Sequence, residues 1–262
     1  MKKSITINVI ATTLLLFLTA AYGDCGCPAG SCCSRFGFCG TGEAFCGTDC
    51  RQGACYYSGF PVAGAVTDVF FNSIKDKAAS TCPGKSFYAR SDFISALDSN
   101  KQFGQMRTAD NSKREIAAFF AHVTHETGHM CYVEEVSGAS RRYCNASYSE
   151  YPCAAGKAYY GRGPLQLSWN YNYGGAGKAL GFDGLRDPQR VANDRGISFK
   201  ASLWFWMTDA HSKVVQGFGA TIRAVNYVEC GGGNSAAVQA RVGYYKDYCA
   251  QFGVSPGDNL SC

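Results

Sequence analysis

The sequence of 262 residues has few of the features that mark several common classes of protein. After its first twenty residues it has no hydrophobic run long enough to cross a membrane, and it has no block of basic residues that would suggest nucleic acid. We find no internal repeat, and the alternating pattern of β-strands is sparse. We therefore expect neither a membrane nor a nucleic acid as a partner.

The N-terminus has the layout of a secretory signal. Lys2 and Lys3 precede an apolar run over residues 9–18, and small residues follow up to Gly23. The run is too short for a comfortable membrane span, so an anchor is the weaker alternative. We expect a signal peptide at residues 1–23 and a secreted, extracellular protein, with vacuolar targeting left open. Cleavage of the signal would remove both lysines and lower the formal net charge from +5 to +3. The remaining charged residues are typical of an ordinary solvated surface.

The fifteen cysteines are unevenly distributed. Their number favours an oxidising compartment, because so many thiols are hard to keep harmless in a reducing cytosol. Eight lie within residues 25–55, and seven are spread over the rest of the chain. We therefore expect a small module at residues 24–55, a short linker at residues 56–64 and a larger domain at residues 65–262.

The small module is too short to fold on hydrophobic burial, so disulfides must replace a core. Between its cysteines lie a hydroxyl, Ser34, and three aromatic residues, Phe36, Phe38 and Phe45. Exposed rings beside a hydroxyl suit sugar binding, because the apolar face of a pyranose stacks on an aromatic ring. The alternative is that one or more rings only cover the disulfides.

The module resembles the hevein-like chitin-binding domain in its eight cysteines and in the segment "CCSRFGFC" at residues 32–39. The resemblance implies that a polymer of N-acetylglucosamine binds to Ser34, Phe36, Phe38 and Phe45. It also implies four disulfides: Cys25 with Cys33, Cys27 with Cys39, Cys32 with Cys46, and Cys50 with Cys55. Because the family commonly has Trp or Tyr at the three aromatic positions, the smaller phenyl rings predict weaker binding.

The larger domain has mainly helical periodicity. We expect helices over residues 66–78, 91–100, 114–127, 197–211 and 236–253. In the first, Val66, Val69, Phe70 and Ile74 share one face, and Ser91 is expected to cap the second. About two hundred residues suffice for one substantial core, so we predict a single, mostly α-helical domain with a cleft.

Residues 125–129 read "HETGH", which is the short signature of zinc metalloproteases. His122, His125 and His129 fall at helical spacing, and two histidines on one helix face can bind a metal. The pattern lacks a third ligand nearby, since Glu150 is no better a candidate than most carboxylates, and Gly128 weakens the helix between the histidines. A zinc metalloprotease using His125, Glu126 and His129 therefore stays only an alternative.

The same segment suits glycoside hydrolysis, which needs one protonated and one ionised carboxyl group. Glu126 lies among Phe119, Phe120 and Met130 in the sequence, and apolar surroundings raise the pKa of a carboxyl group. Glu134 and Glu135 follow shortly after. From residue types alone, a surface ion pair is an equally good interpretation of these two.

Long motifs identify the larger domain more specifically. The segments at residues 119–135, 143–174, 198–208 and 240–249 resemble the plant chitinases of glycoside hydrolase family 19, and the small module and truncated loops are similar to class IV members. The resemblance implies a lysozyme-like, mostly α-helical fold split by a substrate cleft. It implies no metal and no cofactor.

By the same resemblance, Glu126 matches the general acid, Glu135 the general base, and Ser168 a residue that helps to hold the attacking water. The matches to substrate-binding positions are His125, Gln166, Tyr171, Asn172, Lys213 and Arg241. The implied disulfides are Cys82 with Cys131, Cys144 with Cys153, and Cys230 with Cys262, which leaves Cys249 free. One departure is Tyr227, which replaces the glycine that usually follows the asparagine aligned with Asn226.

These observations predict a secreted, inverting endochitinase that carries a chitin-binding module. We expect its partners to be chitin and chitin oligosaccharides, and we expect a monomer. A chitin-binding lectin whose second domain has lost activity is the alternative, and the presence of both expected glutamates disfavours it.

Overall fold

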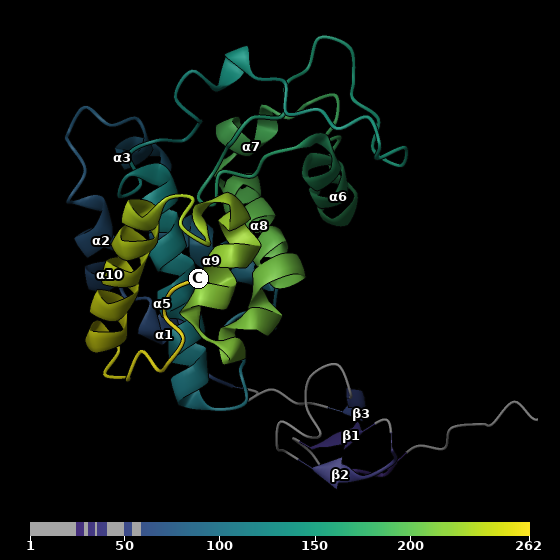
Figure 1. Ribbon diagram of the computed structural model, residues 1–262, viewed down its shortest axis with the longest axis vertical. Coiled ribbons are helices and arrows are strands. Elements are labelled where there is room, and N and C mark those ends of the chain that lie inside the picture. The colour runs from purple at the N-terminus through teal and green to yellow at the C-terminus, as the bar shows by residue number, and fades with distance from the viewer. Residues whose placement is uncertain (1–24, 29–30, 35, 41–49, 54–58) are drawn as a thin grey trace, which may run out of the picture.

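The computed structural model describes residues 25–28, 31–34, 36–40, 50–53 and 59–262 (Figure 1). The expected signal peptide, Phe45, and two expected disulfide partners, Cys46 and Cys55, lie outside the described residues. The small module and the large helical domain are described one after the other.

The small module contains a three-stranded antiparallel sheet in the order β2-β1-β3. Its strands are β1 (Cys32–Ser34), β2 (Cys39–Gly40) and β3 (Cys50–Gly53). Disulfides join Cys25 to Cys33 and Cys27 to Cys39, and the central strand is fully buried at Cys32 and Cys33. Cross-links thus occupy the interior that a larger domain would fill with apolar side chains.

The large domain is mostly α-helical, as predicted. Its first half contains α1 (Val62–Ala65), α2 (Asp68–Lys75), α3 (Gly84–Phe87), α4 (Arg90–Ala96), η1 (Leu97–Ser99), α5 (Ala109–Thr127) and η2 (Gly138–Ser140). Its second half contains α6 (Asn170–Leu180), α7 (Arg190–Asn193), α8 (Arg195–Phe205), the π-helical turn η3 (Trp206–Ala210), η4 (His211–Gln216), α9 (Phe218–Asn226), η5 (Tyr227–Glu229) and α10 (Ser235–Gln251). The expected helices at residues 114–127, 197–211 and 236–253 are present with shifted ends.

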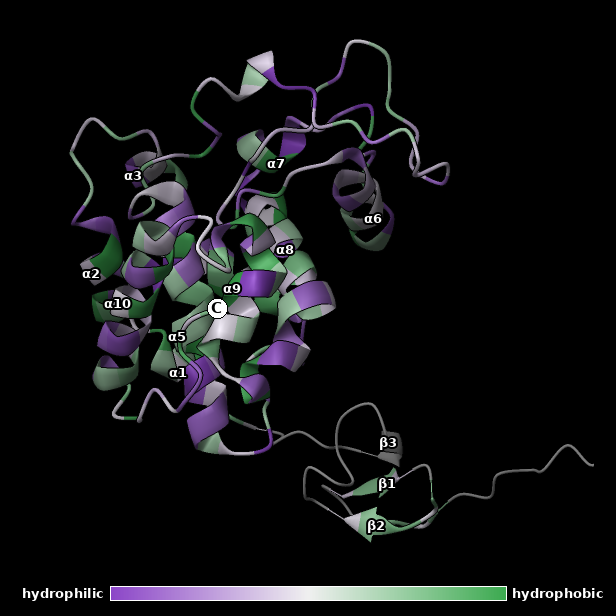
Figure 2. Ribbon diagram, viewed as in Figure 1, coloured by the Kyte–Doolittle hydropathy of each residue, from purple (hydrophilic) through white to green (hydrophobic). Residues whose placement is uncertain are grey.

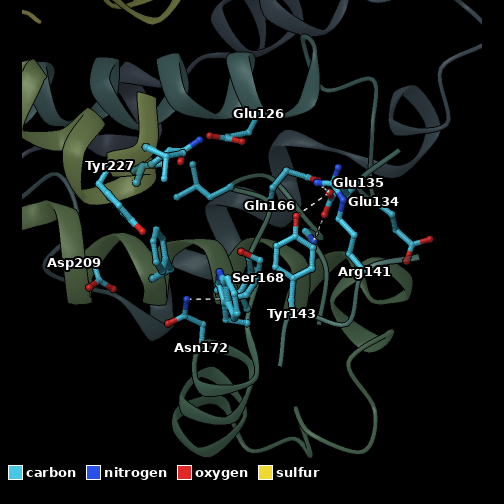
Figure 3. A pocket seen from close by; sticks show the side chains of 18 of the residues that line it. Glu126, Glu134, Glu135, Arg141, Tyr143, Gln166, Ser168, Asn172, Asp209 and Tyr227 are labelled. Atoms are coloured by element: carbon cyan, nitrogen blue, oxygen red, sulfur yellow. Dashed lines mark hydrogen bonds and ion pairs between the residues drawn. The ribbon is translucent and has the colours of Figure 1, made fainter. Parts of the chain in front are cut away.

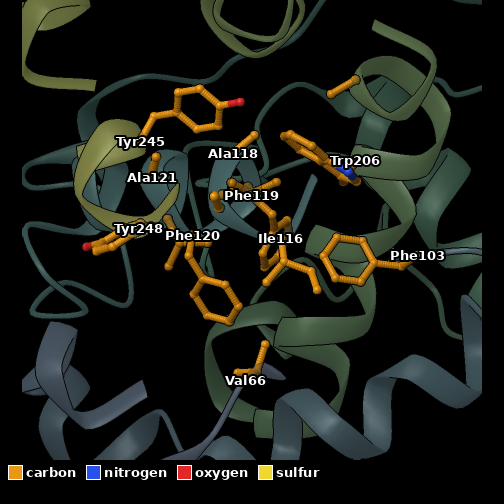
Figure 4. Packing of buried hydrophobic residues seen from close by; sticks show 14 of the residues in the cluster. Val66, Phe103, Ile116, Ala118, Phe119, Phe120, Ala121, Trp206, Tyr245 and Tyr248 are labelled. Atoms are coloured by element: carbon orange, nitrogen blue, oxygen red, sulfur yellow. The ribbon is translucent and has the colours of Figure 1, made fainter. Parts of the chain in front are cut away.

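The main core is built around α5, the long helix that α10 packs against (Figure 1). Phe119, Phe120 and Trp206 are fully buried and meet edge to face, with ring centroids 5.4 Å apart for the two phenylalanines and 5.7 Å for Phe119 and Trp206 (Figure 4). Figure 2 shows hydrophobic positions along α2, α5 and α8, the helices that supply much of this core. Aromatic packing of this kind makes α5 a rigid support for the residues at its C-terminal end.

A second, smaller core lies where α6 and α8 meet the loop at residues 159–167. It contains Tyr159, Leu167, Tyr173, Phe182 and Ile197, all buried. This cluster helps to fix the loop that carries Gln166 and Ser168 through Leu167, while Leu165 of the same loop packs into the main core.

Both ends of α5 have identifiable causes. The Thr108 hydroxyl oxygen accepts a hydrogen bond from the backbone N of Asn111 at 3.1 Å, which satisfies a free donor at the N-terminus. At the other end Gly128 adopts the left-handed conformation with φ 58°, and the helix ends at Thr127. The helix therefore does not continue through "HETGH".

Three local expectations differ from the structure. Val69 is 81% exposed, and Phe71 is buried in its place, because α2 begins at Asp68 under a cap from Thr67. The second expected helix corresponds to α4, which begins at Arg90 without a side-chain cap, so Ser91 lies inside the helix and does not cap it. The brief alternation at residues 164–169 yields only an isolated bridge between Arg162 and Leu167.

The second half of the expected linker packs against the large domain. The Gln105 carboxamide accepts hydrogen bonds from the backbone N of Gly59 and Phe60, and donates to the Phe60 carbonyl at 2.9 Å. Phe60 and Val62 are buried in the main core. Burial of these apolar side chains attaches residues 59–64 to the large domain.

Three disulfides brace the large domain: Cys82 with Cys131, Cys144 with Cys153, and Cys230 with Cys262. These are the pairs that the resemblance implies. Cys249 is a buried free thiol. In the part of the chain that the structure describes, no helix has the length and apolar character needed to span a bilayer.

Candidate active site

A groove with a volume of about 720 Å³ crosses the large domain. Its walls come from four segments that are distant in sequence: the end of α5 with the loop at residues 132–143, the loop at residues 161–172, the junction of α8 with η3, and the end of α9 with η5. Figure 3 shows Glu126 and Glu135 reaching this groove from different segments, with Asp209 and Tyr227 at its other end. Two cores thus hold the two walls of one cleft.

Glu126 lies in the last turn of α5, where its side chain is largely buried. Burial raises the pKa of this carboxyl group, and the charge of Glu229 raises it further, whereas the charge and hydrogen bond of Arg241 oppose the shift. The pKa of Glu126 stays above its ordinary value, so the group holds a proton at higher pH than an exposed glutamate does. The sequence analysis expected this direction, although it attributed it to apolar neighbours only.

Arg241, on α10, is fully buried and joins the groups around Glu126. Its guanidinium donates to Glu126, donates twice to Glu229 at 2.8 Å, and donates to His122 at 3.0 Å. Since arginine offers no acceptor, the Nδ1 atom of His122 must accept, and its Nε2–H donates to Thr221 at 3.0 Å. His122 is therefore neutral, and burial followed by the charge of Arg241 holds its pKa well below the ordinary value.

Glu229 is the partner that balances the charge of Arg241. Burial would raise the pKa of Glu229, but two hydrogen bonds from Arg241, its charge, and a bond from Asn226 at 2.8 Å lower it overall. Because Glu229 is ionised, Arg241 interacts with two carboxyl groups, and its positive charge does not stabilise the Glu126 anion alone. The arrangement allows Glu126 to be protonated in one state and stabilised as an anion in another.

Glu135 lies on the opposite wall and has different surroundings. Its carboxylate accepts hydrogen bonds from the Tyr143 hydroxyl at 2.9 Å, the Gly161 backbone N at 3.1 Å and the Arg141 guanidinium at 3.4 Å. The backbone N of Glu135 also donates to the Gly161 carbonyl at 2.8 Å. Three donors from two segments fix the direction of a carboxylate that still faces the groove.

The loop after Gly161 carries strained backbone. Gln166 and Trp169 have φ values of 48° and 75°, which few non-glycine residues adopt, and they flank Ser168. A Cβ atom on Gly161 would come within 2.8 Å of the Gln166 carboxamide oxygen, so a larger residue here would displace the Gln166 side chain. Asn172 holds the loop by donating to the Ser168 carbonyl at 2.9 Å.

Aromatic rings line the same wall. The Tyr171 ring stacks on Tyr148 with centroids 4.1 Å apart, and it lies nearly parallel to Trp169 at 6.1 Å. Trp169 meets Tyr143, the residue that binds Glu135, at 5.3 Å. A row of rings thus leads from Glu135 along the groove, which is a surface suited to sugar rings.

Glu134 differs from Glu135 in what it binds. It pairs with the fully buried Arg162 at 2.9 Å and accepts a hydrogen bond from Tyr160 at 3.0 Å. The ion-pair interpretation of the sequence thus describes Glu134, whose role is to compensate a buried charge. Glu135 also has an arginine partner, but a largely exposed one.

Six of the nine expected catalytic and substrate-binding residues line the groove: Glu126, Glu135, Ser168, Gln166, Tyr171 and Asn172. The other three are outside its lining. His125 faces Glu229 at 4.0 Å, and burial, followed by the charge of Arg241, lowers its pKa to about 4 although Glu229 opposes this shift. Arg241 lies behind the two glutamates, and Lys213 is exposed on η4.

The zinc alternative fails on geometry. His129 lies beyond the end of α5 with φ 63°, and its ring meets the edge of Tyr244 at 5.2 Å. His125 and His129 therefore do not share a helix face, and His122 uses both ring nitrogens for Arg241 and Thr221. The pattern that defines the protease motif depends on one continuous helix, which Gly128 interrupts.

In the small module, Phe36 and Phe38 are each 67% exposed. Ser34 is 2% exposed, and its hydroxyl oxygen accepts a hydrogen bond from the backbone N of Phe38 at 3.4 Å. The hydroxyl thus holds the turn that carries both rings, and sugar binding by Ser34 stays a prediction.

Several residues in the groove or directly behind it were missed by the sequence analysis. Arg141 and Tyr143 line the groove, and Glu229 lies behind it beside Arg241. The pair Arg141-Arg142 shortly after two glutamates is a signal that could have been followed. Asp209 and Trp169 also line the groove and were not singled out. Only the fold brings these residues to the two glutamates.

The comparisons agree with this geometry. The family described as chitinase class I matches residues 65–215 and 209–262, and the one described as chitin recognition protein matches residues 19–55. The chain belongs to the family 19 chitinases, which are glycoside hydrolases, and it carries a chitin recognition domain.

Particular relatives place it among plant enzymes. The chain is 55% identical to Chitinase 5 of Oryza sativa subsp. japonica, over 97% of this chain and 95% of that protein. It is 54% identical to Endochitinase EP3 of Arabidopsis thaliana, over 99% and 97%. The crystal structure of a family 19, class IV chitinase from Zea mays has a TM-score of 0.74 at 58% identity and covers 76% of this chain and 98% of its own. The predicted family and enzyme class are thereby confirmed.

Proposed function

We propose that this chitinase is a secreted, monomeric endochitinase that hydrolyses β-1,4 linkages between N-acetylglucosamine units with inversion of the anomeric carbon. Residues 1–23 serve as the signal peptide, residues 24–55 bind chitin and residues 65–262 carry the activity. Because residues 59–64 pack on the helical domain, we infer that the linker between the two modules is shorter than the predicted segment 56–64.

The observation that carries this proposal is the contrast between two carboxyl groups in one groove. Burial raises the pKa of Glu126, which suits it to hold the proton that a leaving oxygen needs. Glu135 is oriented by Tyr143, Gly161 and Arg141 and faces the groove, which suits it to accept a proton from water. These are the two roles that an inverting glycosidase requires.

The reaction follows from those roles. Glu126 gives its proton to the glycosidic oxygen as the bond from C1 to that oxygen breaks. Glu135 takes a proton from a water molecule, held also by Ser168, whose oxygen bonds to C1 from the opposite face. Glu126 is left as a carboxylate, and the charge and hydrogen bond of Arg241 stabilise it. The cycle closes when Glu135 releases its proton to solvent and Glu126 takes one up.

Other residues bind the chain of sugars. Gln166, Tyr171 and Asn172 line the groove and supply an amide, an aromatic ring and a second amide for sugar hydroxyl and acetamido groups. His125 and Arg241 act through Glu229 and Glu126, as positioning residues. The exposed rings of Phe36 and Phe38 stack on chitin, and Ser34 holds their turn.

The test is hydrolysis of chitin oligosaccharides by wild type, Glu126→Gln and Glu135→Gln. Each substitution is expected to lower kcat by roughly 10²–10⁴-fold or more while binding persists, because each removes a proton-transfer group. NMR of fresh products should show the α anomer, and EDTA should leave the rate unchanged. A complex with substrate should place the two carboxyl groups about 6.5–9.5 Å apart.

Several outcomes would contradict the proposal. Full turnover by Glu126→Gln would remove the acid assignment, and a β anomer would exclude inversion. Loss of activity in EDTA would implicate a metal. A wild-type protein that binds chitin and cleaves nothing would be the lectin.

A further inference from the structure

Four carboxylates line the groove, and they differ in how their charges are balanced. Three have an arginine partner: Glu126 with Arg241, Glu134 with Arg162, and Glu135 with Arg141. Asp209 lines the groove as well, and within the described residues it has no hydrogen bond or ion pair. The Asp209 side chain is exposed at the groove surface, although desolvation raises the pKa of its carboxyl group. Its charge is thus available to a ligand.

Residues on both sides of Asp209 are anchored in the core of the domain. Asp209 lies on the π-helical turn η3, between Trp206 and His211. Both of these neighbours bind the fully buried carboxylate of Glu115: the Trp206 Nε1–H donates to it at 2.9 Å, and His211 contacts it through Nδ1. Wide turns of this kind often occur at functional sites. Anchoring to the core fixes the direction in which Asp209 faces the groove.

Aromatic rings surround the same end of the groove. The Tyr148 ring stacks on Tyr171 with centroids 4.1 Å apart. Burial raises the pKa of Tyr171, and the negative charge of Asp209 raises it further. Figure 3 shows Asp209 and Tyr227 together at this end, away from Glu135. Tyr227 is 73% exposed and is the residue that departs from the family's usual glycine. A carboxylate among ring faces is an environment that favours a small organic cation.

We propose that this end of the groove is a specificity site for the ammonium group of a deacetylated sugar, with Asp209 as its counter-ion. The substrate would be partially deacetylated chitin, in which glucosamine units are distributed irregularly among N-acetylglucosamine units. An acetamido group is neutral, whereas the free amine of glucosamine is protonated and can form a charge-assisted hydrogen bond. The inference rests on the proposed function, since it requires the groove to bind the sugar chain.

The test compares two substrates of equal length, one fully acetylated and one partially deacetylated. For Asp209→Asn, kcat/KM on the deacetylated substrate should fall about tenfold, which corresponds to about 1.4 kcal/mol, while kcat/KM on the acetylated substrate stays unchanged. Asp247→Asn is the matched control, because it removes the same charge from an exposed site on α10 outside the groove lining. Sequencing of wild-type products should find glucosamine at one fixed position relative to the cleaved bond.

Binding to the Glu135→Gln variant, with and without Asp209→Asn, gives the same comparison without turnover. The result of this binding comparison can therefore be interpreted even if the proposed hydrolysis mechanism is wrong. Equal losses on both substrates would overturn the inference, because Asp209 would then contact a sugar hydroxyl. An unchanged preference, or products with glucosamine at random positions, would overturn it as well.

Discussion

Arg241 shows how one side chain can serve two carboxyl groups. It donates to Glu126 and to Glu229, and the fully buried guanidinium has no access to solvent. Removing either partner of a buried pair leaves an uncompensated charge, which is costly. The value of Glu229 to the enzyme is thus that it lets Arg241 stay close to Glu126.

We predict that Glu229→Gln moves the alkaline limb of the kcat/KM profile to lower pH. Glu229 raises the pKa of Glu126, so its loss lowers that pKa. Since the acid must be protonated, activity then falls at lower pH than in the wild type. The free energy of unfolding should also fall by roughly 1–3 kcal/mol.

Glu150→Gln is the control for this pH profile, because Glu150 pairs with Lys178 on the exposed surface, outside the groove lining. Its profile should match that of the wild type. An alkaline limb that stayed in place or moved upward in Glu229→Gln would contradict the electrostatic role of Glu229.

At the scale of elements, the end of α5 decides what the histidines can do. Gly128 stops the helix in the left-handed conformation, and the chain then turns toward Cys131 and the disulfide with Cys82. The turn keeps Glu126 in the last helical turn beside the groove and takes His129 away from it.

We predict that Gly128→Ala lowers the free energy of unfolding by about 1 kcal/mol, because an alanine in the left-handed region is strained. A Cβ atom at this site meets only Tyr132 and Cys131 at ordinary contact distances, so the cost is conformational. Denaturant unfolding monitored by circular dichroism measures it.

Gly243→Ala provides the opposite control. Gly243 is exposed inside α10, and a Cβ atom there meets nothing within 4 Å. This substitution should stabilise the protein by roughly 0.5–1 kcal/mol, because alanine favours a helix more than glycine does. Equal effects from both variants would contradict the role given to the end of α5.

At the scale of the whole molecule, the sugar-binding surfaces lie on two separately folded parts. The small module relies on disulfides and a three-stranded sheet, and the large domain relies on two apolar cores. Each surface should therefore be separable by mutation without unfolding the other part.

We predict that replacing both Phe36 and Phe38 with alanine weakens binding to insoluble chitin by roughly 10-fold or more, from the loss of two stacking rings. Hydrolysis of soluble oligosaccharides should be unchanged. Val69→Ala, which trims an exposed apolar side chain on α2, should alter neither measurement. Equal losses on soluble and insoluble substrates would show that the rings act on the catalytic domain.

The sequence by itself determined the family and the helical class, and it predicted the roles of the two glutamates, because each of these depends on local patterns and motifs. Helix periodicity predicted α5, α8 and α10. The prediction that Val69 is buried was wrong, because a shift in where the helix starts changes which face is buried. The motif around Glu126 predicted its role as the acid, and the uneven distribution of cysteines predicted two modules.

Only the tertiary structure decided what surrounds those glutamates. Arg241 and Glu229 come from distant helices, and Arg141, Tyr143 and Gly161 meet Glu135 across a loop, so no spacing in the sequence encodes their contacts. The end of α5 at Gly128 separated the histidines of a motif that reads as continuous. Asp209 reaches the groove through the π-helical turn η3, and its place in the same groove as the two glutamates exists only once the chain is folded.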